Sequence, residues 1–282
     1  MPTVADTFTL PLWAWATLAW LGLLGLIACC QGKLLFGRTS RIRRTDPGPA
    51  AARRRAEALT LARPGGVQLQ GWLTTDAQQP PRRLLLWFGG RNEHVAWTPD
   101  LAGWLPEDMA LLAFNYRSLG GSGGWPSEAA CVADAEAIAR WACGHLGLDD
   151  AALHLAGRSL GSGVAMQLAA RWPGGPASLV LITPPKSIRA LLRASPLLAP
   201  LAAVLRSPLD SVAAAGGLRC PVLMLLAERD ARVPHGHSLA LAAALRAAGA
   251  AVDVHLLAGT NHRNLARTPA AMARVGQALG AR

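Results

Sequence analysis

Tyrosine, lysine and charged residues in general are scarce in this chain of 282 residues. Its one tyrosine is Tyr116, and the residue four positions later is Gly120, so the Tyr-x-x-x-Lys pair of a short-chain dehydrogenase is missing. This matters because Gly157, Gly161 and Gly163 match the G-x-x-x-G-x-G pattern of a dinucleotide-binding loop. Such a loop also belongs on the first strand of that fold, near the N-terminus. The sequence therefore excludes this class of oxidoreductase.

Cysteine is also sparse. The five cysteines, an odd number, show no metal-ligand spacing, and we expect buried or free thiols. No metal site, nucleotide-binding loop or haem motif is visible, so no cofactor is expected. The net charge is +11, but residues 33–55 hold eight basic residues against one acidic residue and account for +7 of it. The remaining charge is too small for a basic nucleic-acid-binding face, and no zinc-finger or RNP sequence is present.

The longest uncharged run lies near the N-terminus. Residues 8–30 are almost wholly apolar, and residues 12–30 alone make 19 residues. A helix needs about that length to cross roughly 30 Å of hydrocarbon. Trp13, Trp15 and Trp20 lie towards one end of the run, as in an interfacial aromatic belt. We expect a single-pass transmembrane anchor over residues 1–32.

Three alternatives to a retained anchor stay open: a cleaved signal peptide, a lipoprotein and a buried core helix. A cleaved signal peptide has a basic n-region, whereas Asp6 is the only charged side chain before the apolar run. Leu26-Ile27-Ala28-Cys29 resembles a bacterial lipobox, which is compatible with a lipoprotein. The basic linker, residues 33–55, follows the span, so the positive-inside rule places the domain of residues 56–282 in the cytoplasm. The arginines of the linker are also suited to anionic headgroups.

Beyond the linker, strand and helix patterns alternate. We expect a β-hairpin over 58–61 and 67–73, and strands at 84–88, 109–115, 151–156, 178–182, 221–226 and 252–257. Helical patterns cover 128–146, 164–172, 238–248 and 269–279. This order predicts a mostly parallel sheet with helices on both faces. Residues 186–218 read as a short lid-like insert, whose leucines line an acyl pocket or simply cover the sheet.

A G-x-S-x-G sequence, Gly157-Arg158-Ser159-Leu160-Gly161, lies between the strand at 151–156 and the helix that follows. In that context it predicts a nucleophile elbow, with Ser159 in a strained conformation at the edge of the sheet. The two glycines are needed because a Cβ at either position would clash. An ordinary βα turn is the alternative.

A serine hydroxyl needs a base, usually a histidine that a carboxylate orients. On this topology the three residues follow in the order serine, acid, histidine, each after a strand. Asp230 and His262 satisfy both conditions and are the expected acid and base. Glu228, two residues earlier, is an alternative acid. The weaker candidates, which do not follow a strand end, are Asp210, His235, His237 and His255.

The tetrahedral intermediate of such a reaction needs fixed donors for its oxyanion. We expect the backbone N–H of Leu160 and the backbone N–H of Arg91, after the strand at 84–88. Gly89 and Gly90 let this loop approach the substrate closely, although a plain turn is the alternative. Arg158 suits an anionic group of the substrate, and a solvated arginine is the alternative reading of that residue.

Together these motifs resemble the α/β-hydrolase superfamily, and within it the membrane-anchored BEM46-like hydrolases. The resemblance covers about residues 55–280 and rests on LWFGGRNE at 86–93, NYRSLGGS at 115–122 with PSE at 126–128, the elbow, ERD at 228–230 with VP at 233–234, and NH at 261–262. It implies an α/β-hydrolase fold and a serine hydrolase with Ser159, Asp230 and His262 as nucleophile, acid and base. Two positions depart from the family pattern: Gly89 stands where histidine is frequent, and Arg91 where asparagine is common.

The expected function is therefore cleavage of carboxylic ester or thioester bonds through an acyl-enzyme. The expected substrate is a small or lipid-like acyl compound reached at or near the membrane. A peptidase or amidase would use the same machinery. A non-catalytic, membrane-bound interaction module is the alternative from a different class.

Overall fold

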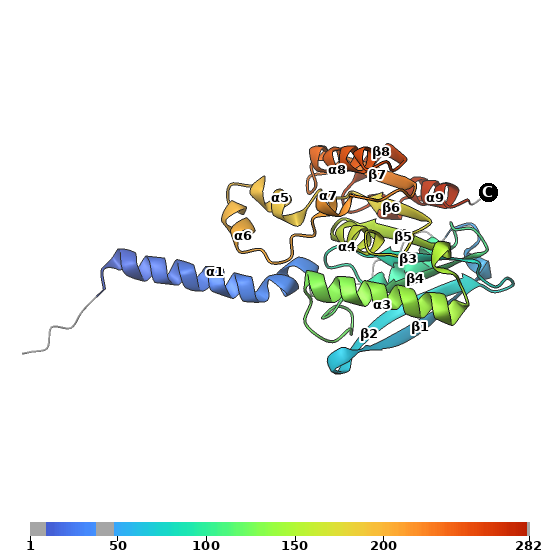
Figure 1. Cartoon of the computed structure of the whole chain (residues 1–282), viewed down its shortest axis with the longest axis horizontal. Helices are drawn as coiled ribbons and strands as arrows, with labels where there is room; N and C mark the ends of the chain where they lie inside the picture. Colours follow the sequence, from blue (N-terminus) through green and yellow to red (C-terminus); the bar gives the residue numbers. More distant parts are fainter. Residues whose placement is uncertain (1–9, 38–47, 281–282) are drawn as a thin grey trace, which may run out of the picture.

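A twisted eight-stranded sheet forms the centre of the computed structural model, which describes residues 10–37 and 48–280 (Figure 1). The strand order is β1-β2-β4-β3-β5-β6-β7-β8. β1 and β2 form an antiparallel hairpin at one edge, and β3 to β8 are mutually parallel. The strands are β1 (Arg54–Arg63), β2 (Val67–Asp76), β3 (Arg83–Phe88), β4 (Met109–Phe114), β5 (Leu153–Arg158), β6 (Ser178–Ile182), β7 (Val222–Arg229) and β8 (Val252–Asn261).

Helices cover both faces of this sheet, as the alternating pattern predicts. Successive residues of β3 show why: Leu84 and Leu86 belong to one buried cluster, and Leu85 and Trp87 to the other. The first cluster lies under α3 (Glu128–Leu146), α4 (Leu160–Ala169) and α8 (His235–Ala247). The second lies under α2 (Thr98–Ala102) and α9 (Pro269–Ala278).

Most of the observed helices and strands lie where the sequence predicts them, but one helix begins earlier and one was not predicted. The helix predicted at 128–146 and the strand predicted at 178–182 have the expected bounds. The helix predicted from residue 164 begins at Leu160, because the elbow passes directly from strand to helix. The short helix α2 has no counterpart among the predicted elements.

The N-terminal helix α1 (Leu12–Phe36) projects from the domain (Figure 1) and is long and apolar enough to span a membrane. Its two ends differ. Leu12 is 88% exposed, whereas Phe36 is fully buried and packs edge-on against Tyr116, with ring centroids 5.0 Å apart. The helix therefore extends past the predicted boundary after residue 32, by one more turn that reaches the core of the domain.

The predicted basic linker, residues 33–55, is only partly described. Arg38, Arg41, Arg43 and Arg44 lie outside the described residues. At its far end, the Arg54 guanidinium donates hydrogen bonds to the backbone carbonyls of Leu105 and Pro106, and β1 begins at Arg54 itself. Arg54 is thus part of the first strand of the domain, and its guanidinium is already hydrogen-bonded there.

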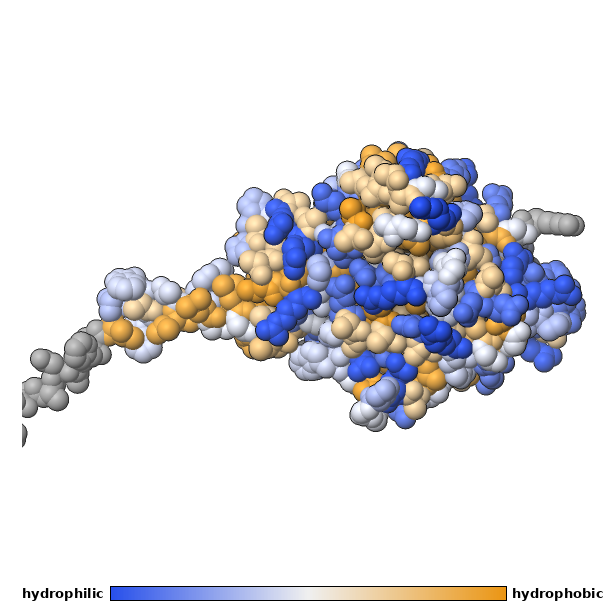
Figure 2. Space-filling model, viewed as in Figure 1, coloured by the Kyte–Doolittle hydropathy of each residue, from blue (hydrophilic) through white to orange (hydrophobic). Residues whose placement is uncertain are grey.

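The lid-like insert contains three short helices, α5 (Ile188–Arg193), α6 (Ala199–Ala203) and α7 (Ser211–Ala214). It meets α1 through Gln31, a polar residue near the end of the apolar run. The Gln31 side chain accepts a hydrogen bond from the Arg206 backbone N–H at 2.6 Å and donates one to the Val204 carbonyl at 3.4 Å. The insert and α1 therefore form one continuous cap beside the sheet. Apolar residues lie along much of α1 up to the domain, with paler, less hydrophobic residues among them (Figure 2).

Candidate active site

The G-x-S-x-G sequence forms the sharp turn that its glycines predict. Ser159 lies between β5 and α4 with φ 52° and ψ −119°, a conformation that costs free energy for a residue with a Cβ. A Cβ on Gly157 would lie 2.5 Å from the Gly161 carbonyl oxygen, and one on Gly161 would lie 2.3 Å from the Phe88 carbonyl oxygen. Both contacts are too short, so the turn requires glycine at both positions.

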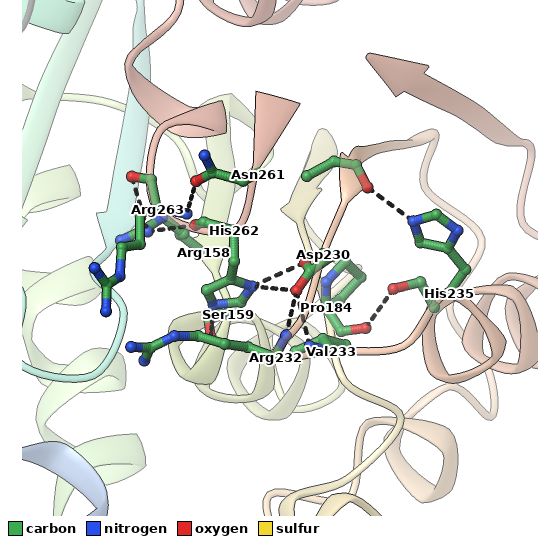
Figure 3. A network of polar contacts seen from close by, with 12 residues as sticks. Arg158, Ser159, Pro184, Asp230, Arg232, Val233, His235, Asn261, His262 and Arg263 are labelled. Atoms are coloured by element: carbon green, nitrogen blue, oxygen red, sulfur yellow. Dashed lines mark hydrogen bonds and ion pairs between the residues drawn. The ribbon is translucent and has the colours of Figure 1, made fainter. Parts of the chain in front are cut away.

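Three side chains from three strand ends meet at this turn (Figure 3). His262 Nε2 lies 3.0 Å from Ser159 Oγ, and His262 Nδ1 lies 2.8 Å from Asp230 Oδ2. Asp230 follows β7 and His262 follows β8, so the carboxyl ends of β5, β7 and β8 bring the three groups together. The sequence predicts this set of residues, and the structure places them in hydrogen-bonding contact.

The Asp230 carboxylate is held in place by the loop that follows it. Its Oδ1 accepts hydrogen bonds from the backbone N–H groups of Arg232 at 2.9 Å and Val233 at 2.8 Å. Burial raises the pKa of Asp230, but the hydrogen bonds from His262 and Val233 outweigh it and hold that pKa below its usual value. The ionised carboxylate can only accept, so His262 Nδ1 carries a proton and Nε2 is free to accept the Ser159 hydroxyl proton.

The two predicted oxyanion donors border the same space as Ser159. Leu160 is the first residue of α4, where backbone N–H groups have no partner within the helix. In the loop after β3, the Gly90 N–H donates to Glu93 Oε2 at 2.7 Å and the Asn92 N–H donates to the Phe36 carbonyl at 3.0 Å. The Arg91 N–H between them makes no hydrogen bond within the described residues.

The glycines of this loop are fixed by neighbours that the sequence analysis does not identify. The Tyr116 hydroxyl donates to the Gly89 carbonyl at 3.0 Å, and a Cβ on Gly90 would lie 3.1 Å from Glu93 Oε2. The one tyrosine of the chain thus helps to orient the loop after β3. Its position after β4 indicates this role only once β3 and β4 are known to be neighbours.

Arg158 is buried, which rules out the alternative reading of a solvated arginine, and its role in binding an anionic group of the substrate stays a prediction. Its guanidinium donates to Glu93 Oε2 at 2.5 Å and to the His262 carbonyl at 2.7 Å. Burial raises the pKa of Glu93, but the positive charges of Arg158 and Arg267 outweigh it and lower that pKa, so Glu93 is ionised. This buried pair connects the loop after β3 to Arg158, the last residue of β5, which directly precedes Ser159. Glu93 has no predicted role in the sequence analysis.

An apolar cavity of about 740 Å³ opens on one side of Ser159. The insert contributes most of its leucines to this cavity: Leu191, Leu192, Leu198, Leu201 and Leu205. Leu197 does not line it and is 85% exposed. Of the two interpretations of the insert, this favours leucines that line a pocket over leucines that only cover the sheet. The opposite wall is not predicted from the sequence: α1 supplies it through Ile27, Ala28, Gln31, Leu34 and Leu35.

A second cavity of about 340 Å³ adjoins the same serine and has the opposite character. Five arginines line it: Arg91, Arg158, Arg232, Arg263 and Arg267. Glu93 is the only carboxylate among its lining residues. His94 also borders this cavity, and burial lowers its pKa, so it is neutral at neutral pH.

The weaker candidates from the sequence have other contacts. Glu228 accepts a hydrogen bond from the Gly259 N–H, and Asp210 caps the N-terminus of α7. His235 contacts the Ala227 carbonyl, and His255 lies in β8 beside Asp253. His237 is buried in α8. Over residues 10–37 and 48–280, no cluster of three histidine, cysteine or acidic residues is placed to hold a metal ion.

The sequence matches one protein family model and several known proteins. Residues 79–212 match the family model described as serine aminopeptidase, S33. The chain is 32% identical over 180 residues to an uncharacterized protein of Mycobacterium tuberculosis. The aligned region covers 64% of this chain and 63% of the relative. It is 25% identical over 199 residues to the alpha/beta hydrolase domain-containing protein WAV2 of Arabidopsis thaliana, over 64% of each chain. The chain thus spans just under two thirds of the length of these relatives.

Solved structures resemble the whole domain. An acetyl xylan esterase from Paenibacillus sp. R4 superposes with a TM-score of 0.66 at 17% identity, over 92% of this chain and 93% of that one. A hyperthermophilic esterase from Pyrobaculum calidifontis gives a TM-score of 0.62 at 19% identity, over 83% and 86%. At such identities the likeness establishes the fold. The chain therefore has the α/β-hydrolase fold, and residues 79–212 are similar in sequence to the serine aminopeptidase, S33, family.

Proposed function

We propose that this protein is a membrane-anchored serine hydrolase that cleaves carboxylic ester or thioester bonds through an acyl-enzyme. The observation that carries the proposal is the hydrogen-bonded series Asp230–His262–Ser159, with contacts of 2.8 and 3.0 Å, beside an open cavity. A strained serine between two obligatory glycines is costly for a surface turn, which favours a catalytic over a purely structural role.

In the first half of the reaction, Ser159 Oγ forms a bond to the acyl carbon while its proton passes to His262 Nε2. The bond between that carbon and the leaving oxygen or sulfur then breaks, and His262 returns the proton to the leaving group. In the second half, a water molecule gives its proton to His262 and attacks the acyl carbon. The carboxylic acid leaves, and Ser159 Oγ recovers its proton. Asp230 holds the imidazole in the required tautomer throughout.

The oxyanion of each tetrahedral intermediate would lie between the Leu160 and Arg91 backbone N–H groups. Donors at such positions typically contribute about 2.7–4 kcal/mol each to transition-state stabilisation. Gly89 and Gly90 keep the loop close to the serine, and the Glu93–Arg158 pair and the Tyr116 hydroxyl hold that loop. Arg158 acts in this proposal as a positioning residue for the loop and for the His262 backbone.

An aminopeptidase is the second candidate, because the matching family model carries that description. Such an enzyme must bind a substrate ammonium group near the nucleophile, which requires an available carboxylate. The polar cavity offers five arginines instead, and its one carboxylate, Glu93, is already paired with Arg158. The two solved structures with this fold that are named above are of proteins described as esterases. Both observations favour ester over peptide substrates.

We also propose that α1 is retained as the anchor, as in BEM46-like hydrolases. Its last turn packs into the core through Phe36, so a cleavage beyond that residue would remove part of the core. Processing before Cys29, as in a lipoprotein, would remove Ile27 and Ala28 from the cavity wall. The positive-inside rule favours a cytoplasmic domain. An intact mass that includes residues 1–28 supports retention, and a mass that begins at Cys29 contradicts it.

The proposal is tested by ester turnover of the full chain in detergent with single triad variants. We expect Ser159→Ala to remove turnover. We expect Asp230→Asn to lower kcat about 10⁴-fold, the size of the effect that loss of the orienting acid has in serine proteases. Glu228→Gln is the matched control, because Glu228 lies at the end of the same strand, β7, but accepts a hydrogen bond from the Gly259 backbone N–H instead of contacting His262. Turnover that survives Ser159→Ala contradicts the proposal. A wild-type protein that is folded but inactive would favour the interaction-module alternative.

A further inference from the structure

The two cavities meet at the candidate nucleophile. Both are lined by Ser159 and His262, and also by Arg91 and Arg232. An ester bound at Ser159 has two parts, the acyl chain and the alcohol, and each needs a space of its own. Two cavities of opposite polarity beside one serine therefore provide one space for the acyl chain and one for the alcohol.

The apolar cavity fits an acyl chain. Its volume of about 740 Å³ lies in the usual range for small-molecule sites, and leucine and isoleucine side chains dominate its walls. Apolar surface that leaves water gains free energy roughly in proportion to its area, so longer chains bind more tightly until the cavity is full. No titratable acidic side chain lines it.

The polar cavity fits an anion. Arg232 and Arg263 are exposed, and their guanidinium groups have no hydrogen-bond or ion-pair partner within the described residues. Arg267 lies 3.8 Å from Glu93 and stacks over Trp97, and Arg158 is paired with Glu93. Five guanidinium groups against one carboxylate leave an excess of positive charge. Arginine is well suited to phosphate and carboxylate groups because its planar fork donates two parallel hydrogen bonds.

The position of α1 connects the apolar cavity to the membrane. Residues of its last three turns, among them Ala28, Leu34 and Leu35, form one wall of the cavity, while the first part of the helix is exposed and apolar. The Arg91 side chain joins the two sides, because its Nε donates to the Leu34 carbonyl at 2.8 Å. An acyl chain that leaves a lipid layer along α1 would enter the cavity with its polar end towards the arginines.

We propose that the substrate is a long-chain acyl ester whose alcohol carries a phosphate or carboxylate close to the ester bond. This inference rests on the proposed serine hydrolase function. The bond that breaks is the one between the acyl carbon and the alcohol oxygen. The anionic alcohol leaves with the proton from His262, and water completes the release of the fatty acid.

The test compares matched substrates with the full chain in detergent or phosphatidylcholine vesicles. The four substrates are monooleoylglycerol, its 3-phosphate, and the butyryl counterparts of both. We expect kcat/KM for the oleoyl phosphate to exceed that for the neutral oleoyl ester at least tenfold, and to exceed that for the butyryl phosphate. The anionic preference should shrink as salt is added, because salt screens exposed charges. A carboxylate in place of the phosphate shows which anion is preferred.

Arg232→Ala and Arg263→Ala should each lower the ratio of anionic to neutral kcat/KM several-fold. Arg82→Ala is the matched control, because Arg82 is exposed at the opposite end of β3 and should leave the ratio unchanged. A fluorophosphonate that labels Ser159 separates the two claims. If Ser159 is labelled but neutral esters are preferred, or the arginine variants keep the wild-type ratio, this inference is wrong and the hydrolase proposal stands. If Ser159 is not labelled, both fail.

Discussion

The two walls of the candidate site are built on different physical principles. The wall formed by α1 and the insert is apolar and depends on packing, since Phe36 and the insert leucines hold it in place. The wall formed by the loops after β3 and β8 is charged and depends on buried pairs, above all Glu93 with Arg158. The apolar wall should respond to side-chain volume and acyl-chain length, and the charged wall to pH, salt and removal of single charges.

The largest effect is expected from Arg158→Met in the charged wall. It leaves the buried Glu93 carboxylate without its nearest cation, which typically costs about 3–5 kcal/mol of stability. Thermal unfolding in detergent measures the effect. The control is Arg140→Met, which breaks the exposed Arg140–Glu136 pair and should cost about 0–1 kcal/mol. Equal losses in the two variants would contradict the view that burial makes the Glu93 pair important.

Phe36→Ala should have a similar or slightly smaller effect on the apolar wall. Truncation of a fully buried phenylalanine typically costs about 3–5 kcal/mol. The same helix offers its control: Leu12→Ala, at a residue that is 88% exposed, should change the unfolding temperature of the domain very little. A domain that tolerates both substitutions equally would show that the end of α1 is not part of its core.

Gly32→Leu should separate α1 from the domain by steric clash. A Cβ at Gly32 would lie 1.8 Å from the Pro126 carbonyl oxygen, and overpacking of this kind typically costs about 1–3 kcal/mol. Gly25→Leu in the same helix is the control, because a Cβ there meets nothing within 4 Å. Limited proteolysis and thermal unfolding report the difference. Similar behaviour of the two variants would contradict the docked arrangement.

Ala28→Phe should reduce the apolar cavity without touching the triad. We expect kcat/KM for oleoyl esters to fall about tenfold relative to butyryl esters, since a single methylene in a filled pocket is already worth about 10–200-fold. The control is Leu18→Phe, which changes an exposed residue on α1 outside the cavity. A fall in activity that is the same for both chain lengths would argue against α1 as a wall for the acyl chain.

The smallest effect is expected on the pH dependence of stability. The folded-state pKa of Glu93 is lowered, so its contribution is fully present above the unfolded-state pKa of about 4.3 and is lost as pH falls through the folded-state pKa. Glu93→Gln lacks this contribution at every pH. The difference in unfolding temperature between wild type and Glu93→Gln should therefore narrow between pH 7 and pH 3. A difference that widens on acidification would contradict an ionised Glu93.

Much of the sheet and the three contacting side chains could be predicted from the sequence, because they rest on local rules. The glycines beside Ser159, and the positions of Asp230 and His262 after strands, are readable from short motifs and strand order. The sequence leaves open whether the leucines of the insert line a pocket or cover the sheet, and in the structure most of them line a cavity.

What could not be predicted depends on contacts between distant segments. The end of α1 lies beside residues 80 or more positions away, such as Tyr116 and Pro126, and no local pattern encodes that docking. Gln31 was a possible signal, as a polar residue at the end of an apolar run, because such residues usually have a partner. The pairing of Arg158 with Glu93 likewise requires knowledge that β3 and β5 are neighbours.

The most direct test of a competent nucleophile at Ser159 is labelling of the folded, full-length protein with a fluorophosphonate probe, in parallel with Ser159→Ala. We expect one label on the wild type, located on Ser159 by peptide mass, and none on the variant. Unlabelled wild-type protein with an intact unfolding transition, or equal labelling of the variant, would contradict a serine hydrolase.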